Sequence, residues 1–438
     1  MTIKSALSTS AFSRRGFLGV AAAAASVPLL AACGGGSASQ GAGGTIKFWD
    51  MPWGPPAYSD LAKKLTESYV PTGSLGKASY QTIQWNNFYQ TFSSAIASKT
   101  GPALSTGGGF QAFQFAEQGQ IAYADNVISK LKQNGQYNDF LPGTIESQNT
   151  DKGYVAVPWS QGPRVVWYRK SLLDRAGVAV PTDWKSWLEA GKALKGIGVS
   201  AFGIGAGAGN VFGNQNLLSM MINNGGGLFN EDGRPDVVTD RNIEAMEFVR
   251  EMVSLGLIDP GAVSYTLDNL SSQWKDKKIG MGWYAPGLPE STGDTSGDLQ
   301  VASPLAGPHG DKGTVNYIGS IMMYKNTPSQ EGSEAFLLWY LGQLKEFWKQ
   351  DVVGLLPVQQ SIVDLPEFQK NKQNVQIIKE WQSVGKPFGT KSPRLFGSLA
   401  AVDGGQALSQ FAQTMLGARA DAKTALTDLQ KGIESVTK

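Results

Sequence analysis

The chain has 438 residues, of which 41% are hydrophobic and 10% aromatic, enough for two or three globular domains with sizeable cores. Its formal charge of +2 gives no electrostatic reason to expect a nucleic acid or another polyanion as partner. The single cysteine, Cys33, excludes an internal disulfide framework, and the single histidine, His309, lies in a turn-like segment typical of a solvated loop. We therefore expect no Ser-His-Asp or Cys-His catalytic group and no metal site.

Residues 1–32 have the features of an export signal. Ser13–Leu18 contains the adjacent arginines of a twin-arginine (Tat) signal. The apolar run that follows, Val20–Ala32, is too short and too rich in alanine for a membrane span and is typical of a signal peptide.

A lipoprotein cleavage box follows the apolar run. Leu30–Cys33 reads Leu-Ala-Ala-Cys, which predicts that Cys33 is acylated, for example with palmitate, and becomes the mature N-terminus. Residues 33–44, rich in Gly, Ser and Ala, are expected to form a flexible tether. The mature chain would carry 35 basic and 36 acidic residues. We therefore expect an extracytoplasmic protein anchored to the cell membrane by its lipidated cysteine.

Strands and helices alternate from Thr45 onward. The expected elements are a strand at Thr45–Trp49, a helix at Tyr58–Tyr69, a strand at Tyr80–Trp85, a helix from about Phe88 and a strand at Ala103–Thr106. This alternation predicts a largely parallel sheet flanked by helices. Ligands of such sheets bind beyond the carboxyl ends of the strands, where this chain has Asp50, Trp53, Trp85 and Phe110.

The segment Gly153–Lys170 is predicted to carry the chain from one lobe to another. It contains two short apolar strands, and Pro158 ends the first of them because proline cannot donate a hydrogen bond to a neighbouring strand. Trp159, Gln161 and Arg164 lie between the two strands. A polar and aromatic break of this kind suits a crossover that faces a ligand.

The order of motifs resembles the extracellular solute-binding proteins of ABC importers, the large family that includes maltose-binding protein. The second strand of the crossover ends in Tyr168-Arg169-Lys170 where the family has Tyr-Asn-Lys, and Leu355–Val358 matches the family's Leu-Pro-Val element. A further family pattern is matched by Leu172, Leu173, Ala176, Gly177, Pro181, Thr182 and Trp184. The chain departs from the family at Ala103, where Pro-Asp-Val is usual.

The resemblance implies a two-lobed α/β fold of the periplasmic-binding-protein type, with a mostly parallel sheet in each lobe. It places a second crossover at Ile279–Tyr284, after which Leu299–Ser303 and Tyr317–Tyr324 would lie in the first lobe. The expected N-terminal lobe is then 45–157 with 283–327, and the expected C-terminal lobe is 158–282 with 328–438.

The 12 tryptophans suit carbohydrate, because sugar C–H faces pack on aromatic rings while hydroxyl groups need several donors and acceptors. The candidate binding residues are Asp50, Trp53, Trp85, Phe110, Trp159, Gln161, Arg164, Asn210, Phe212, Trp283, Tyr284, Tyr317 and Arg394. Among these, Asn210, Phe212 and Arg394 are implied by the resemblance. Two alternatives stay open, since Arg164 could pair with a carboxylate and Asp50 could cap the following loop. Trp187 is expected on an outer helix.

These observations predict a monomeric protein without cofactor that captures a mono- or oligosaccharide and delivers it to the transmembrane subunits of an ABC permease. It is expected to catalyse nothing. Two alternatives remain. One is a binder of a phosphorylated polyol such as a glycerophosphodiester, held by Arg164 and Arg394. The other is a secreted glycoside hydrolase that depends on two carboxylates.

Overall fold

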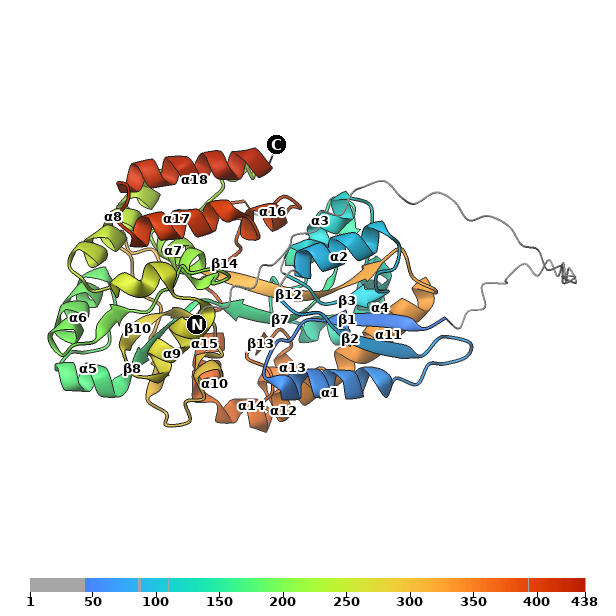
Figure 1. The fold of residues 1–438 in the computed structure, drawn as a ribbon. Coiled ribbons are helices and arrows are strands. Elements are labelled where there is room, and N and C mark those ends of the chain that lie inside the picture. The colour runs from blue at the N-terminus through green and yellow to red at the C-terminus, as the bar shows by residue number, and fades with distance from the viewer. Residues whose placement is uncertain (1–43, 86–87, 109, 393, 438) are drawn as a thin grey trace, which may run out of the picture. The chain divides into compact units, whose positions relative to one another are not determined.

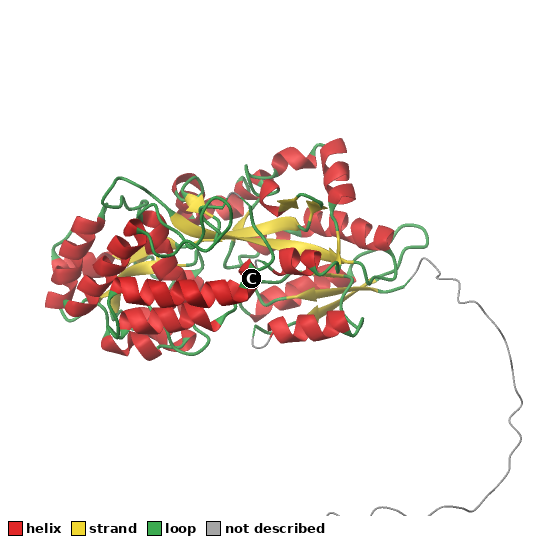
Figure 2. Cartoon of the chain, turned by 90° about the horizontal axis from the view of Figure 1, so that it is seen from above, coloured by secondary structure: helices red, strands yellow, loops and turns green. Residues whose placement is uncertain are grey.

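The computed structural model describes residues 44–85, 88–108, 110–392 and 394–437 (Figure 1). The predicted signal peptide and Cys33 lie outside these residues. Strands run through the interior and helices cover them (Figure 2). Across the described part of the chain, no helix combines the length and hydropathy needed to cross a membrane.

The first sheet has the strand order β13-β7-β12-β3-β1-β2, and β4 and β14 also pair with β12. Its strands are β1 (Ile46–Asp50), β2 (Ala78–Thr82), β3 (Leu104–Ser105), β4 (Ile121–Ala122), β7 (Val157–Pro163), β12 (Thr314–Tyr324), β13 (Leu356–Pro357) and β14 (Gly385–Lys386). β1 is parallel to both β2 and β3, as the alternation of strands and helices predicts. β12 is antiparallel to β3, β4 and β7.

The second sheet has the order β11-β8-β10-β9. Its strands are β8 (Val165–Arg169), β9 (Ser200–Phe202), β10 (Ile279–Tyr284) and β11 (Leu299–Val301). β8 is antiparallel to both β10 and β11, and only the β9–β10 pair is parallel. The expectation of a mostly parallel sheet in each lobe is therefore wrong for this sheet, because β8 is a crossover strand that enters it in the opposite direction. A separate hairpin joins β5 (Asn149–Thr150) and β6 (Gly153–Tyr154).

The first predicted crossover is confirmed. β7 ends at Pro163 in the first sheet and β8 begins at Val165 in the second, so Arg164 is the single residue between the two strands. The backbone of Arg164 is fixed on both sides, since its N–H donates to the carbonyl of Val315 and its carbonyl accepts from the hydroxyl of Thr314. The junction between the sheets is thus held against β12.

The second crossover differs from the prediction. β10 stays in the second sheet over its whole length, and Leu299 pairs there with Arg169, so the placement of Leu299–Ser303 in the first sheet is wrong. β12 brings the chain back, and the placement of Tyr317–Tyr324 in the first sheet is confirmed. The division into lobes at 45–157 with 283–327 stays a prediction. Because β11 pairs with β8, the chain stays in the second sheet until β12 carries it back to the first sheet.

Helices pack on both sheets. Those near the first sheet are α1 (Pro56–Glu67), α2 (Phe88–Ala97), α3 (Gln111–Glu117), α4 (Asp125–Gln133), η1 (Gln136–Asp139), η2 (Glu146–Gln148) and α11 (Gln330–Gln343). Those near the second are α5 (Lys170–Ala176), α6 (Trp184–Gly196), α7 (Phe212–Asn223), α8 (Asp240–Ser254), η3 (Pro260–Ser264), α9 (Leu267–Lys275), α10 (Leu288–Thr292), α15 (Lys372–Glu380), α17 (Gln406–Leu416) and α18 (Ala422–Val436). The remaining short helices are α12 (Lys345–Lys349), α13 (Gln360–Val363), α14 (Pro366–Lys370) and α16 (Leu399–Asp403).

Local sequence explains two of these helices. α1 begins at Pro56, whose missing N–H costs nothing at a first helical position, and it buries Tyr58, Leu61 and Ala62 on one face. α6 begins after Asp183, whose carboxylate accepts from the backbone N–H of Ser186 at 2.7 Å while the hydroxyl of Ser186 lies 3.1 Å from the N–H of Asp183. This reciprocal capping box makes Asp183 the N-terminal cap of α6.

α11 does not follow the predicted division, which assigns 328–438 to the C-terminal lobe. Its Phe336 and Tyr340 rings lie 5.6 and 5.0 Å from the ring of Phe48 on β1. α11 therefore covers the first sheet. The reason is that its apolar face complements the buried face of β1, a contact between segments far apart in the chain.

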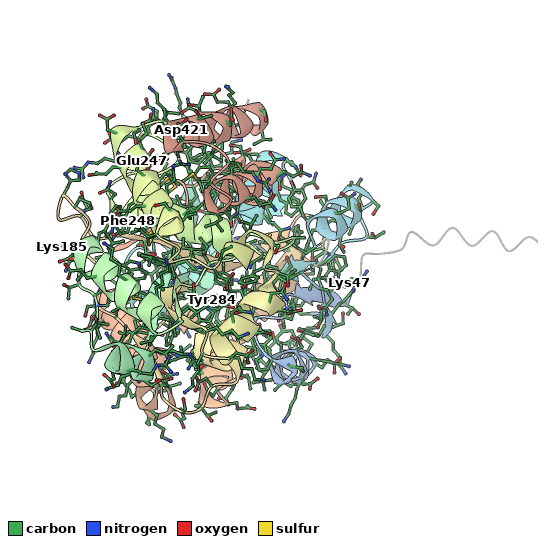
Figure 3. The ribbon with its side chains drawn as sticks, turned by 60° about the vertical axis from the view of Figure 1, so that its left-hand side comes forward. Lys47, Lys185, Glu247, Phe248, Tyr284 and Asp421 are labelled. Carbon is green, nitrogen blue, oxygen red and sulfur yellow. The ribbon has the colours of Figure 1, made fainter. Side chains whose placement is uncertain are left out.

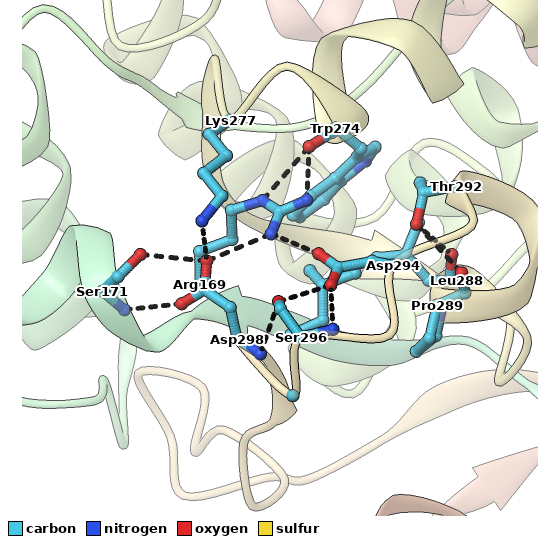
Figure 4. A network of polar contacts seen from close by, with 12 residues as sticks. Arg169, Ser171, Trp274, Lys277, Leu288, Pro289, Thr292, Asp294, Ser296 and Asp298 are labelled. Atoms are coloured by element: carbon cyan, nitrogen blue, oxygen red, sulfur yellow. Dashed lines mark hydrogen bonds and ion pairs between the residues drawn. The ribbon is translucent and has the colours of Figure 1, made fainter.

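A buried arginine fastens the edge of the second sheet (Figure 4). Arg169 is fully buried at the end of β8, and its Nη1 donates to Asp294 at 2.6 Å and to Asp298 at 3.1 Å. Its Nε and Nη2 donate to the carbonyl oxygen of Trp274 at the end of α9, at 3.1 and 2.5 Å. Where the family has asparagine, this chain thus uses a longer side chain to join β8, α9 and the loop before β11.

Candidate functional site

Six residues form the arginine cluster, which lies at the junction of the two sheets. Its members are Arg164, Phe212, Gln215, Tyr284, Tyr317 and Asp403. The guanidinium carbon of Arg164 lies 4.8 Å from the ring centre of Tyr317 and 5.4 Å from that of Phe212. Phe212 in turn stacks on Tyr284, with ring centres 4.0 Å apart and an interplanar angle of 11°. Tyr284 ends β10 and lies in the interior of the molecule (Figure 3).

Hydrogen bonds fix the direction of the Arg164 side chain. Its Nε donates to Oε1 of Gln215 at 2.7 Å, and its Nη1 donates to the carbonyl oxygen of Gly162 at 2.7 Å. Both acceptors are neutral, and among the described residues no carboxylate lies within ion-pair distance of this guanidinium. The alternative in which Arg164 pairs with a carboxylate and so stiffens the crossover is therefore wrong. The side-chain amide of Gln215 and the backbone carbonyl of Gly162 hold the guanidinium instead.

Asp403 is the nearest acidic member of the arginine cluster. The hydroxyl of Tyr317 donates to its Oδ1 at 3.3 Å. Burial raises the pKa of Asp403 to about 6, against the opposing effects of the Tyr317 hydroxyl and of the positive charge of Arg164. Burial likewise lowers the pKa of Arg164, which tyrosine and aspartate neighbours partly offset. The cluster thus holds one cation and one carboxylate that interact without touching.

A second group, the tryptophan cluster, consists of Trp53, Trp85 and Trp159. Trp53 contacts the other two rings edge-on, with centre distances of 4.9 Å to Trp85 and 5.6 Å to Trp159. The indole N–H of Trp53 donates to the hydroxyl of Thr106 at 3.1 Å, and that of Trp85 donates to the carbonyl of Pro52 at 3.1 Å. Trp85 is 42% exposed and Trp53 is half-buried, so both rings offer surface to a ligand.

Trp159 differs from its two neighbours because it is buried. Its ring packs near Tyr58, Phe347 and Trp348, at centre distances of 6.3, 6.4 and 6.2 Å. Trp159 is thus not accessible in this conformation, and its contact with a ligand stays a prediction. The strand β7 directs this side chain into the core under α1 and α12, where it supports Trp53 instead.

Asp50 is also buried, at the end of β1. One carboxylate oxygen accepts from the hydroxyls of Tyr58 and Tyr80 at 3.0 and 3.3 Å, and the other accepts from Thr106 at 2.5 Å. Burial raises its pKa to about 6, although these hydrogen bonds lower it. These internal partners do not favour the predicted ligand contact of Asp50, which stays a prediction. The carboxylate is occupied inside the protein, and Thr106, held by it, accepts from the N–H of Met51 in the following loop.

The raised pKa of Asp50 predicts a pH-dependent stability. The folded state binds the carboxyl proton of Asp50 more tightly than the unfolded state does. The contribution of Asp50 to stability is therefore fully present below about pH 4 and is lost as the pH rises through about 6. We expect Asp50→Asn to reduce this fall, measured by urea unfolding between pH 4 and 7. Asp60→Asn, an exposed change on α1, is the control. Asp403 contributes a fall of the same sign, which should persist in Asp50→Asn; an unchanged pH profile would contradict the assignment.

A cavity of about 340 Å³ adjoins the arginine cluster. Phe110 lines it, and the ring of Phe110 lies 6.1 Å from Tyr317 and 5.1 Å from Phe388. Gln161 also lines the cavity, donating to the carbonyl of Pro357 at 3.1 Å and accepting from Asn316 at 3.3 Å. The volume falls within the range of small-molecule sites.

Arg394 reaches the same cavity from the segment before α16. It is largely exposed and forms an ion pair with Asp151. The cavity is lined by residues of β7, β12 and β14 in the first sheet and by residues from 142 to 149, so it joins parts of the chain that are far apart in sequence. Of the predicted residues, the cavity therefore brings together Phe110, Gln161 and Arg394.

Trp283 and Asn210 do not belong to these groups. The Trp283 ring is buried against Trp187 and Phe202, at centre distances of 5.1 and 6.0 Å, which favours a role in the core over its predicted ligand contact. Trp187 is equally buried, in the core between α6 and the second sheet. Asn210 donates to the carbonyl of Tyr265 at 2.9 Å and accepts from the N–H of Phe212 at 3.0 Å, so it positions Phe212 rather than a ligand.

Sequence reasoning missed Gln215 and Asp403. Gln215 lies one helical turn after Phe212 on α7, and this i, i+3 spacing is the signal that places it on the same face. Asp403 ends the short helix α16 and carries no local pattern that points to a site. Its place in the cluster depends on the contact of Asp403 on α16 with Tyr317 on β12. These segments are far apart in the chain, so no local sequence pattern predicts the contact.

Comparisons with known proteins agree with this architecture. The family model for "Bacterial extracellular solute-binding protein" matches residues 76–343. A sugar transporter from Arthrobacter chlorophenolicus A6, solved with bound laminaribiose, is 60% identical and superposes with a TM-score of 0.85, covering 90% of this chain and 100% of that one. The maltose-bound MalE3 of T. maritima is 16% identical, with a TM-score of 0.73 over 89% of this chain and 99% of that one. At 16% identity, the likeness to MalE3 shows a shared fold alone.

A curated relative matches a smaller part. The arabinooligosaccharide-binding protein of Halalkalibacterium halodurans is 22% identical over 253 residues, which are 55% of this chain and 56% of that protein. The family match spans more than half of the present chain and includes both crossings between the sheets. This chain belongs to the bacterial extracellular solute-binding proteins and has their two-lobed α/β fold.

Proposed function

We propose that this protein captures a short carbohydrate, such as a glucose disaccharide of the laminaribiose type, and delivers it to the transmembrane subunits of an ABC permease. The observation that carries the proposal is the 60% identity, over 90% of the chain, to a sugar transporter that holds laminaribiose. No catalytic step is part of the proposal. Binding and release are sufficient for a member of this family.

The geometry supports a sugar as ligand. Trp53 and Trp85 offer ring faces and edges at the carboxyl ends of β1 and β2, where sugar C–H groups can pack. The arginine cluster supplies further donors and acceptors, including Gln215 on α7 and Tyr317 on β12. A ligand that contacts both sheets would favour the conformation in which they approach, so capture would proceed by a shift in population about the junction at Arg164.

Calorimetry and thermal unfolding with laminaribiose test this function. We expect saturable binding without any product, and an increase in the free energy of unfolding of about 2.7 kcal/mol when the sugar is present at 100 times its dissociation constant. Maltose and free glucose serve as comparison ligands that differ in linkage and length. Absence of binding to all three sugars would overturn the proposal, and release of glucose from laminaribiose would indicate a hydrolase instead.

We also propose that the mature protein is a lipid-anchored monomer exported by the Tat route. The support lies in the sequence of Ser13–Leu18 and in the Leu-Ala-Ala-Cys box that ends at Cys33. Cys33→Ala is expected to move the protein from the membrane fraction to the soluble fraction in cells, because the acyl chains would be lost. Mass spectrometry of the wild-type protein should show an acylated Cys33; a free thiol there would refute the anchor.

A further inference from the structure

The buried Arg164 raises a question of charge. A guanidinium in the interior usually pairs with a carboxylate, because burial of an unpaired charge is costly. Arg164 instead donates to the neutral oxygens of Gln215 and Gly162, and its faces pack near Tyr317 and Phe212. Taken alone, this arrangement would suit an anionic ligand, since a phosphate or carboxylate could complete the pair.

Asp403 changes that expectation. Its Oδ1 accepts from the hydroxyl of Tyr317, and the ring of Tyr317 lies 4.8 Å from the guanidinium carbon of Arg164. The carboxylate therefore lies at the hydroxyl end of the ring whose face Arg164 contacts. Its charge balances that of the arginine at close range while leaving the arginine without a direct ion pair.

The other basic groups near the site are balanced as well. Arg394 pairs with Asp151, and the cavity that Arg394 lines with Lys386 also contains Glu146. Within the part of the chain that the structure describes, neither of the two arginines proposed for a phosphorylated ligand is left without a nearby carboxylate.

We propose that Asp403 is a specificity-determining residue, which admits neutral carbohydrate and disfavours an anionic sugar of the same shape. The inference rests on the proposed function and names the charge class of its ligand. A second negative charge brought to the arginine cluster would meet Asp403 as well as Arg164, and like-charge repulsion of this kind discriminates between ligands.

The test compares two ligands of matched shape, laminaribiose and the same disaccharide with one hydroxymethyl group oxidised to a carboxylate. Calorimetry at pH 7.5 should show that the wild type binds the neutral sugar at least tenfold more tightly. Asp403→Asn should narrow this preference by about tenfold, mainly through tighter binding of the anionic sugar. Thermal unfolding of each variant checks that it is folded.

Two further variants separate charge from shape. Tyr317→Phe removes the hydrogen bond to Asp403 but keeps the carboxylate, so the preference should be retained. Asp151→Asn frees Arg394 at the exposed side of the cavity and should change the preference less than twofold. If Asp151→Asn narrows the preference and Asp403→Asn leaves it unchanged, the discrimination lies at Arg394 and the inference is wrong.

The pH gives an independent readout. Arg164 and Tyr317 are the ionisable groups that act on Asp403 among the described residues, and burial raises the pKa of this carboxyl to about 6. The wild-type preference should therefore weaken between pH 7.5 and 5, while that of Asp403→Asn should not; a flat wild-type profile would oppose the inference. If the wild type binds neither sugar, the proposed function itself fails.

Discussion

Replacement of Arg169 with methionine is expected to lower the free energy of unfolding by about 3–5 kcal/mol, because it leaves the largely buried carboxylate of Asp294 without a cation and that of Asp298 with Lys277 alone. Their side chains are only 10% and 9% exposed. The variant also removes two donors to the carbonyl oxygen of Trp274. Urea unfolding at pH 7 measures the loss. A change below about 1 kcal/mol would show that Arg169 does not hold this edge of the second sheet.

Lys170→Met is the matched control for Arg169→Met. Lys170 is the next residue along the chain and pairs with Asp174, but both side chains are more than 60% exposed. Exposed pairs of this kind contribute little to stability because water screens them, so the control should be close to the wild type.

The difference between Arg169→Met and the wild type should also depend on pH. Burial alone would raise the pKa of Asp298, but hydrogen bonds from Ser171, Lys277 and Arg169 together lower it to about 2. A lowered pKa stabilises the folded state above about pH 4, and this contribution is lost as the pH falls toward 2. The gap between variant and wild type should therefore narrow in acid. This sign is opposite to that expected for Asp50.

Trp283→Ala is expected to cost about 3–5 kcal/mol of stability, since it empties a buried space against Trp187 and Phe202. Trp85→Ala should behave in the opposite way. Because Trp85 is 42% exposed, its loss should change stability little but weaken laminaribiose binding by about 10- to 150-fold, if a sugar packs on it with about 1.5–3 kcal/mol.

Chemical unfolding and calorimetry on the same two proteins decide this comparison. The assignment predicts that Trp283→Ala is the less stable protein and Trp85→Ala the weaker binder. If Trp283→Ala is stable but has lost laminaribiose binding, Trp283 belongs to the binding site. If Trp85→Ala binds laminaribiose with unchanged affinity, the tryptophan cluster does not belong to it.

Much of the first sheet could be predicted from local pattern. The strand expected at Thr45–Trp49 is observed at Ile46–Asp50, and the helix expected at Tyr58–Tyr69 is observed at Pro56–Glu67. Apolar spacing and the Pro56 start are local properties that survive folding. The crossover was predicted in part, because two apolar strands with a break between them were expected here. The expected end of the first strand at Pro158 is wrong, since β7 runs on to Pro163 and only Arg164 separates it from β8.

The candidate site was predictable only in part. Tyr284, Phe212 and Tyr317 were expected from strand ends and from the family resemblance, and the structure places them beside Arg164. The same argument placed Trp283 in the site, but the structure buries its ring against Trp187 and Phe202. Adjacent residues of a strand point to opposite faces, so Tyr284 joins the arginine cluster while Trp283 enters the core. The sequence does not show which face is which.

By itself, then, the amino-acid sequence determined the two sheets' first strands, the helix starts and the first crossing between sheets, since these depend on periodicity, capping and proline over a few residues. Tertiary structure alone decided the return through β12, the packing of α11 on β1, the hydrogen bonds of Arg169 and the contact of Asp403 with the hydroxyl of Tyr317. Each of these depends on which distant segments pair. Strand order and side-chain complementarity settle that pairing, and neither leaves a short-range pattern in the chain.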